Sequence, residues 1–130
     1  MYRFVIELQN ARMVVIFFYN EEKVGEATLI NDADILRLKW IEIVDKHKSK
    51  GLGTMLMDHI TDNILNDNQL FQISVVDEAT LPFYFSFFDK RNIQKETMFD
   101  WVQDGDVHPE INVPKGSLKN VSANKFKASF

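Results

Sequence analysis

Cysteine is absent from the 130 residues of this chain. Without it the chain has no disulfide, no thiol nucleophile and no thiolate ligand for a metal ion. No run of residues approaches the ~18 consecutive apolar residues of a membrane span. The start of the chain also lacks the apolar stretch of a signal peptide. We therefore expect a cytoplasmic protein that makes no contact with a membrane.

Several catalytic signatures are missing as well. The chain contains no Walker loop, and its Gly-Leu-Gly segment at 51–53 lacks the third glycine of a dinucleotide-binding fingerprint. No Gly-x-Ser-x-Gly motif is present, so nothing supports serine hydrolase chemistry. The three histidines, His47, His59 and His108, are not spaced with carboxylates as metal ligands are. We predict no metal site.

Acidic residues are missing from the end of the chain. All 19 lie at or before Glu110. Four lysines follow it, namely Lys115, Lys119, Lys125 and Lys127. Residues 1–110 carry a formal charge of −8 (11 basic against 19 acidic residues), the tail carries +4, and the whole chain carries −4. Such a protein does not bind nucleic acid by its charge. Its acidic body either steers a cationic substrate or simply serves solubility.

The residues that are present predict one domain. Apolar residues make up 45% of the sequence, and no repeat, low-complexity run or linker interrupts it. Runs rich in β-branched and aromatic residues predict strands at 2–8, 12–19, 24–30, 35–44 and 70–76, with further candidates at 93–102 and 111–113. Helical spacing predicts helices over 52–65 and 81–88, with a turn-rich loop over 103–109. We predict an α+β domain over 1–114 and a basic tail over 115–130 that is partly ordered at most.

The segment from Trp40 to Thr54 carries the main functional prediction, an anion-binding site at the start of a helix. An apolar strand enters a short basic loop, and a helix pattern starts immediately after it. The first N–H groups of a helix lack intrahelical partners and carry the positive end of its dipole, so they bind phosphate well. Gly51 and Gly53 allow the backbone to approach a ligand closely. From spacing alone, a solvated turn that caps the helix is an equal alternative.

Segment 48–53 (Lys-Ser-Lys-Gly-Leu-Gly) resembles the Arg/Gln-x-x-Gly-x-Gly/Ala signature of the GNAT superfamily of acetyl-CoA-dependent N-acetyltransferases. Lys48 stands where the family usually has Arg or Gln, and Asp45 stands where many members have Pro. Segment 82–84 (Pro-Phe-Tyr) resembles a second family segment, although Phe88 and Asp89 replace the usual Gly and Phe.

The resemblance covers about half of the chain, residues 24–92. The family usually has one or two helices between its first two strands, and these helices build part of the acceptor site. Residues 7–11 leave no room for them.

The resemblance implies a single GNAT-like domain with a mixed sheet of about six to seven strands and flanking helices. The fourth and fifth strands would splay apart to admit acetyl-CoA. A bulge is implied on the fourth strand, where the apolar alternation changes phase at Trp40 and Ile41. The implied cofactor-binding residues lie on this strand, in the loop and at the helix start: Ile41, Ile43, Val44, Lys46, Lys48, Ser49, Lys50, Gly51, Leu52, Gly53 and Thr54.

The implied reaction is acyl transfer from a thioester to an amine. An ammonium must lose a proton before it can attack, so a base is needed. Glu42 is the preferred candidate, with Asp45 and Asp77 as alternatives, although each is also a plausible solvated carboxylate. The resemblance implies that Tyr84 protonates the leaving thiolate. The alternative is that Tyr84 is a tyrosine of the hydrophobic core.

Two functions from different classes follow. The first is an N-acetyltransferase that acts on an amine of unknown identity, carried by a small molecule or by a protein. The second is a non-catalytic GNAT-like module that binds acyl-CoA or a protein partner. A homodimer formed through the basic tail is compatible with both.

Overall fold

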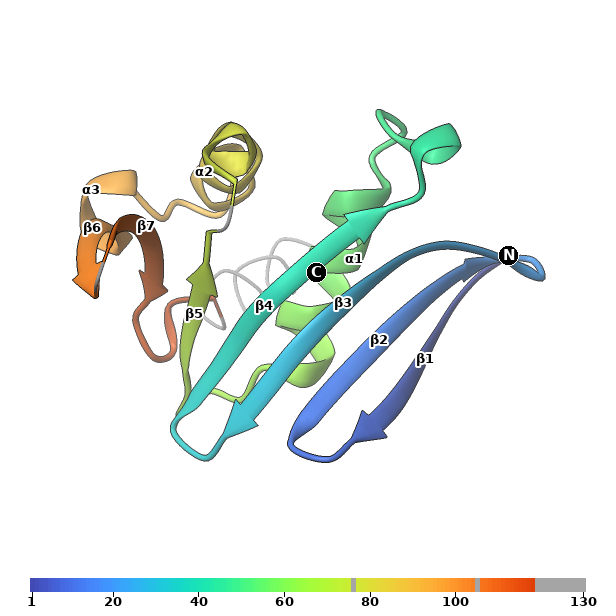
Figure 1. Cartoon of the computed structure of the whole chain (residues 1–130), viewed down its shortest axis with the longest axis horizontal. Coiled ribbons are helices and arrows are strands. Elements are labelled where there is room, and N and C mark those ends of the chain that lie inside the picture. The colour runs from blue at the N-terminus through green and yellow to red at the C-terminus, as the bar shows by residue number, and fades with distance from the viewer. Residues whose placement is uncertain (76, 105, 119–130) are drawn as a thin grey trace, which may run out of the picture.

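The computed structural model describes residues 1–75, 77–104 and 106–118. Seven strands form one sheet in the order β1-β2-β3-β4-β5-β7-β6 (Figure 1). The strands are β1 (Tyr2–Gln9), β2 (Arg12–Tyr19), β3 (Glu22–Asp32), β4 (Ile35–Ile43), β5 (Leu70–Ser74), β6 (Phe99–Asp104) and β7 (Asp106–Val113). The helices are η1 (Asp45–His47), α1 (Leu52–His59), η2 (Ile60–Ile64), η3 (Glu78–Thr80), α2 (Leu81–Asp89) and α3 (Lys95–Met98). The predicted α+β domain with a mixed sheet is confirmed.

The first four strands form an antiparallel meander with tight turns. Asn10 and Asn20 adopt positive φ angles of 58° and 55° in the turns after β1 and β2. Asparagine tolerates this conformation better than most residues do. β1 and β2 pair along their whole length from Tyr2↔Tyr19 to Gln9↔Arg12. The turn between them is therefore as short as the sequence predicts, and no helix separates the first two strands.

One face of the sheet carries all of the packed helices. α1 lies behind β3 and β4, and α2 and α3 lie beside β5 and the last hairpin (Figure 1). We call this the covered face. Apolar side chains of β2 to β5 and β7 point toward it and join the helices in one core. Its fully buried members include Phe17, Leu29, Leu38, Leu56, Phe71, Phe88 and Ile111. Burial of each such side chain contributes roughly 1.5–3 kcal/mol.

The opposite face, which we call the open face, carries no helix among the described residues in front of β1–β4 (Figure 1). Ile16, Thr28 and Gln72 lie on it and are only half-buried. A hydrogen-bonded row crosses the open face, in which Arg37 Nε donates to Gln72 Oε1 at 2.9 Å and Gln72 Nε2 donates to Asn112 Oδ1 at 3.0 Å. The polar residues of this face thus satisfy one another.

Two sequence-based predictions near the end of the chain need correction. The described residues of the predicted 103–109 loop, 103–104 and 106–109, belong to strands, because β6 and β7 pair as a hairpin with Val102 opposite His108. β7 also pairs with β5, with Phe71 opposite Val113. This double pairing overrides the local turn propensity of Asp, His and Pro. The predicted strand over 93–102 begins only at Phe99, since α3 occupies Lys95–Met98.

The buried side of α2 is also wider than predicted. The sequence places Leu81, Tyr84, Phe85 and Phe88 on one face, but the buried residues are Tyr84, Phe87 and Phe88. The α2 segment is apolar on almost every side, so its periodicity does not define one stripe.

The predicted basic tail falls mostly outside the described residues. Only Lys115–Leu118 of the 115–130 segment is described, and the prediction of partial order for the remainder stays a prediction. None of the helices in the described part of the chain is long and apolar enough to cross a membrane.

Candidate active site

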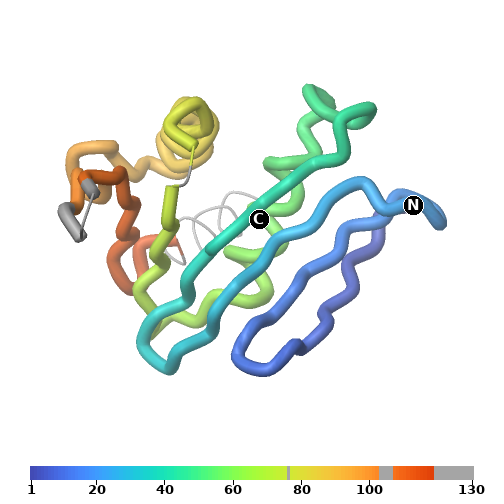
Figure 2. The backbone as a smooth tube through the Cα atoms, viewed as in Figure 1, coloured from blue at the N-terminus to red at the C-terminus, as the bar shows by residue number. Residues whose placement is uncertain are grey.

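β4 and β5 part after a short stretch of parallel pairing. They pair only from Ile35↔Leu70 to Leu38↔Ile73. β4 then continues to Ile43 paired with β3 alone, and β4 and β5 diverge (Figure 2). The parting coincides with a β-bulge at Lys39, which has no partner between Trp40↔Thr28 and Leu38↔Leu29. The predicted bulge is confirmed, one residue before the predicted phase change, because Lys39 is the extra residue.

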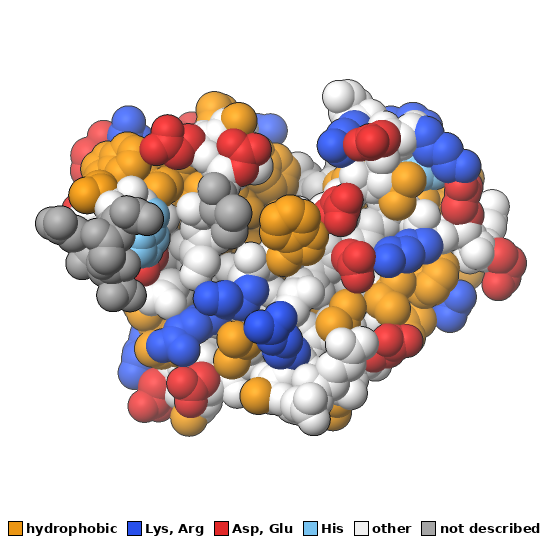
Figure 3. All heavy atoms as spheres, viewed as in Figure 1, with side chains coloured by type: hydrophobic (Ala, Val, Ile, Leu, Met, Phe, Trp, Pro, Cys, Tyr) orange, Lys and Arg blue, Asp and Glu red, His pale blue; other side chains and the backbone are white. Residues whose placement is uncertain are grey.

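A cleft of about 840 Å³ occupies the space where the strands part, and Figure 3 shows the hollow between the two arms of the molecule. The cleft is lined by Lys39–Ile43 of β4, the loop and start of α1, Ser74 of β5 and the segment around η3 and α2. Trp40 and Glu42 lie on the open face, whereas Ile41 lies on the covered face. Since residues of both faces line it, the cleft passes through the sheet.

The start of α1 forms one wall of the cleft. Gly51 caps α1 with φ 78° and ψ 9°, and no side chain accepts a hydrogen bond from the first turn. Met55 N donates to Gly51 O at 3.2 Å, so the earlier N–H groups precede the first bond of the helix. A Cβ added at Gly51 meets nothing within 4 Å. Donors and open space therefore coincide at this wall.

α2 forms the opposite wall, and Phe83 reaches across from it. A Cβ added at Gly53 would lie 3.3 Å from Cε1 and Cζ of the Phe83 ring. Glycine at this position thus admits the ring beside the first turn of α1. The two walls meet at this contact.

Tyr84 is only 5% exposed, yet it lines the cleft. Burial raises the pKa of its phenol to about 12 by disfavouring the charged form. No hydrogen-bond partner of its hydroxyl occurs among the described residues. The group is therefore a protonated donor at neutral pH with nothing in the described fold to donate to.

Glu42 is exposed on the open-face side of the cleft. Trp40 Nε1 donates to Glu42 Oε2 at 3.3 Å, which holds the carboxylate beside a half-exposed indole. Glu26 lies directly opposite on β3. Asp77 also lines the cleft, but its Oδ1 accepts from Ala79 N at 2.9 Å and so fixes a turn.

No protein-family model and no curated protein matches this chain. Solved structures do match. An acetyltransferase from Thermus thermophilus is 20% identical with a TM-score of 0.58, over 82% of this chain and 66% of that protein. A GNAT family acetyltransferase from Elizabethkingia anophelis, with acetyl-CoA bound, is 14% identical with a TM-score of 0.56, over 79% and 76%.

A third match is the diaminobutyrate acetyltransferase EctA from Paenibacillus lautus, in complex with L-2,4-diaminobutyric acid and coenzyme A. It is 13% identical with a TM-score of 0.57, over 79% of this chain and 70% of that one. The fold is the GNAT fold.

In this GNAT fold the basic loop is less positive than its lysines indicate. Lys46 forms an ion pair with Glu22, and Lys48 Nζ lies 2.8 Å from Asp45 Oδ1. These contacts lower the pKa of both carboxyls, chiefly through the lysine hydrogen bonds. Lys50 has no ion-pair partner in the described residues. Two of the three lysines are therefore already neutralised.

His47 lies in the same loop and faces the cleft. Its side chain is 14% exposed, and its buried Nε2 has no hydrogen bond. Glu22 Oε2 is 3.5 Å from this nitrogen, which is long for a hydrogen bond. Because Nε2 is buried beside Glu22, it is not accessible to a ligand in the cleft.

The cleft brings together most of the predicted site residues. Those that line it are Tyr84, Glu42, Ile41, Ile43, Lys48, Ser49, Gly51, Leu52, Gly53 and Thr54. Three predicted residues do not line it, namely Val44, Lys46 and Lys50. Val44 N donates to Val24 O at 2.9 Å, which directs its backbone to β3. Asp45, an alternative base, is also outside the lining and holds Lys48.

Sequence reasoning missed Lys39 and Phe83. Lys39 ends a regular apolar–polar alternation just before the adjacent apolar pair Trp40-Ile41, which is a weak sign of a bulge. Phe83 was visible within the Pro-Phe-Tyr segment, but its contact with Gly53 spans 30 residues. No His, Asp or Glu cluster within the described ranges could hold a metal ion.

Proposed function

We propose that this protein is an N-acetyltransferase that transfers an acetyl group from acetyl-CoA to an amine. One observation carries the proposal. A single cleft through a GNAT fold joins unsatisfied backbone donors at a helix start to a buried phenol without a partner. The first feature suits a phosphate group and the second suits a leaving group that needs a proton.

The residues present fit the cofactor. Its phosphates would be held by the N–H groups at the start of α1, with room beside Gly51. Past Leu38, the edge of β4 that faces β5 has no strand partner, so its backbone groups are available to an amide-containing chain. Acetyl-CoA would supply the acyl thioester.

The chain's own groups then account for the protons. Glu42, directly or through a water molecule, accepts the proton that the ammonium form of the acceptor must lose. The nitrogen forms a bond to the acyl carbon as the carbon–sulfur bond breaks. Tyr84 donates its proton to the departing sulfur, and the second proton of the amine nitrogen restores the phenol.

The open-face mouth of the cleft favours a cationic acceptor. Glu42 lines the cleft there with Glu26 as its cross-strand neighbour, and Asp77 is a further carboxylate of the cleft lining. The half-exposed indole of Trp40 offers a surface for a cation as well. The acceptor is therefore proposed to be a positively charged amine, on a small molecule or on a protein.

The decisive experiment is calorimetric titration of acetyl-CoA and CoA into wild type and Gly51→Glu. We expect micromolar binding to wild type, about −8 kcal/mol, and its loss when an anion occupies the phosphate position. Gly116→Glu is the matched control, because Gly116 has the same φ of 78° and lies outside the cleft. Equal loss in both variants, or no binding to wild type, would refute the cofactor assignment.

One observation favours a second candidate, a non-catalytic GNAT-like module that binds acyl-CoA or a protein partner. The tight β1–β2 turn replaces the helices that build the acceptor side, and the open face stays bare (Figure 3). Binding of CoA with no acetylation of any amine in a broad panel would favour this module over the enzyme.

A further inference from the structure

β1 is an unprotected edge of the sheet. Only β2 pairs with it among the described elements, and Figure 1 shows nothing on its outer side. Proteins usually blunt such an edge with proline, a bulge or a short strand, because free N–H and C=O groups recruit another strand. β1 has eight residues and regular pairing with no bulge. It also exposes Tyr2, Ile6 and Leu8 by 45%, 47% and 76%.

The hydrogen bonds of the first hairpin decide which groups point outward. Asn20 N donates to Met1 O at 2.8 Å, so the carbonyl of Met1 faces β2. Backbone direction alternates along a strand, so the odd-numbered residues of β1 bond to β2. The N–H and C=O groups of Tyr2, Phe4, Ile6 and Leu8 therefore point outward and await a partner.

The side chains of β1 are self-complementary about Val5. In an antiparallel pair of two copies centred there, Arg3 lies opposite Glu7 of the other copy at both ends. On the covered face, Phe4 then lies opposite Ile6, and Tyr2 lies opposite Leu8. Direct cross-strand neighbours of this kind stabilise a sheet by roughly 0.2–1 kcal/mol each.

Both charged residues are available for this contact. The Arg3 guanidinium lies over the Phe18 ring at 4.6 Å on the open face and forms no ion pair within the described residues. Glu7 has no partner there either. On the covered face Phe4 is held by stacking on Phe17 at 4.4 Å and on His59 at 3.9 Å. The edge is thus rigid where a second strand would dock.

We propose that two copies of this chain pair through β1, antiparallel and centred on Val5, to form one continuous sheet. The outward backbone groups restrict pairing to even residues against even residues. Centring on Phe4 or on Ile6 would also meet that condition, but would place Val5 opposite Arg3 or Glu7. Only centring on Val5 joins the two charges, so charge selects the register.

The symmetry of this contact closes the assembly at two copies. The same strand serves both partners, which is an isologous interface with a two-fold axis. The far edge of the sheet is β6, whose sequence differs from that of β1, so it does not offer the same self-complementary contact.

The test is the mass of the full chain by sedimentation equilibrium across a concentration series. We expect a dimer for wild type. Arg3→Glu and Glu7→Arg each place like charges at both ends of the contact, so each should raise the dissociation constant by about 10-fold or more. An equimolar mixture of the two variants should restore the dimer. In the mixed pair, the two acidic side chains of one variant lie opposite the two basic side chains of the other.

Ile6→Pro is the backbone variant of the test, because it removes an outward N–H without disturbing the bonds to β2. We expect a monomer with an unchanged circular dichroism spectrum. A monomeric wild type, variants as dimeric as wild type, or a mixture that stays monomeric would each overturn the proposal.

Discussion

The two walls of the cleft present different chemical groups, backbone N–H groups on one side and side chains on the other. The α1 wall presents backbone N–H groups, and it depends on one glycine with φ 78° at its helix start. The α2 wall presents side chains, the Phe83 ring and the Tyr84 phenol. The α1 wall suits a ligand group that is recognised by its negative charge. The function of the α2 wall depends on single side-chain atoms, such as the hydroxyl of Tyr84.

This difference separates binding from chemistry. Substitutions of side chains on the α1 wall leave its N–H groups in place, so they should change affinity modestly. Substitutions on the α2 wall can remove the reactive proton while the binding groups stay untouched. If this separation holds, substitutions on the two walls will have different effects on binding and on turnover.

Tyr84→Phe should lower turnover by about 10²–10⁴-fold, the usual contribution of a positioned proton donor. The ring still fills the core, so acetyl-CoA affinity and folding should hardly change. Steady-state kinetics with calorimetry measures both. Ser49→Ala on the α1 wall is the control and should alter turnover only a few-fold. Equal effects of the two variants would contradict the division between the walls.

Gly25→Ala tests the β4 segment that lies between the walls. Its Cβ would come within 2.7 Å of Ile43 Cδ1 and 2.8 Å of the Glu42 carbonyl oxygen. Because the backbone of β4 must shift, we expect a loss of about 2–3 kcal/mol in the free energy of unfolding.

Gly53→Ala provides the comparison, since its Cβ would lie 3.3 Å from the Phe83 ring and at an ordinary 3.9 Å from Ile43 Cγ1. A flexible ring can yield, so this variant should cost less than Gly25→Ala. Urea denaturation of both variants measures the difference. A larger cost for Gly53→Ala would show that the Phe83 contact is rigid.

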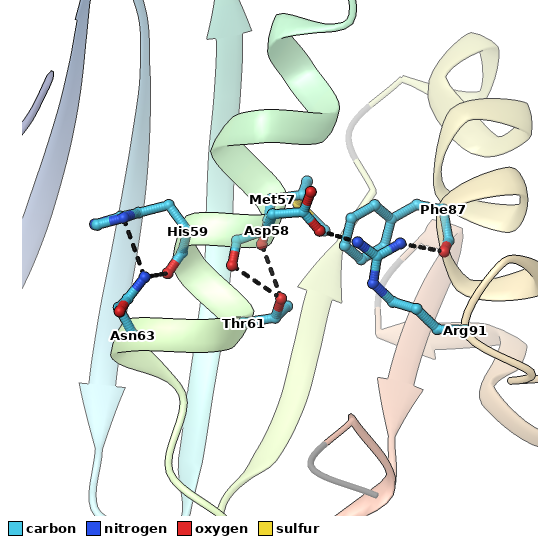
Figure 4. A network of polar contacts seen from close by, with 7 residues as sticks. All are labelled: Met57, Asp58, His59, Thr61, Asn63, Phe87 and Arg91. Carbon is cyan, nitrogen blue, oxygen red and sulfur yellow. Dashed lines mark hydrogen bonds and ion pairs between the residues drawn. The ribbon is translucent and has the colours of Figure 1, made fainter. Parts of the chain in front are cut away.

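Arg91 joins the two walls on the side away from the cleft (Figure 4). It forms an ion pair with Asp58 of α1, and its Nη1 donates to Phe87 O at 2.9 Å. Its guanidinium also lies 3.5 Å from the centre of the Phe87 ring. We expect Arg91→Met to reduce the free energy of unfolding by about 1–2 kcal/mol.

Asp58→Asn keeps an acceptor for Arg91 and should cost less than Arg91→Met. A double-mutant cycle by urea denaturation isolates their coupling. A coupling near zero would mean that the walls are held in place by the apolar core alone.

His59 lies outside both walls, so its titration should affect the stability of the fold and not the cleft. Burial lowers the pKa of its imidazole below 6.5, with a smaller opposing effect from Asp62. As pH falls, the imidazole therefore binds a proton in the unfolded state before it does so in the folded state. The stability that comes from the neutral, buried imidazole is fully present above the unfolded pKa and is lost as pH falls toward the folded pKa.

Between about pH 7 and pH 5, we expect the free energy of unfolding to fall further for wild type than for His59→Phe, by up to about 1 kcal/mol. Thermal unfolding at several pH values measures this difference. Identical pH profiles for the two proteins would contradict the assigned shift.

Much of the fold was predictable because its signals are local. The alternation in β1 to β5, the asparagine turns and the apolar stripe after Gly51 are read within a few residues of one another. The helix predicted over 52–65 is present as α1 followed by the π-turn η2, with Leu65 N bonded to Ile60 O at 2.9 Å. The hairpin over 103–109 was not predictable, since its pairing with β5 outweighs its own turn residues.

The candidate site divides in the same way. The strand–loop–helix unit with Gly51 and the helix that carries Tyr84 follow from residue spacing and propensity within each segment. Long-range packing sets the parting of β4 and β5 at Lys39, the packing of Phe83 on Gly53 and the neutralisation of Lys46 by Glu22. These contacts join residues far apart in the chain, and such pairings form only when the whole core closes.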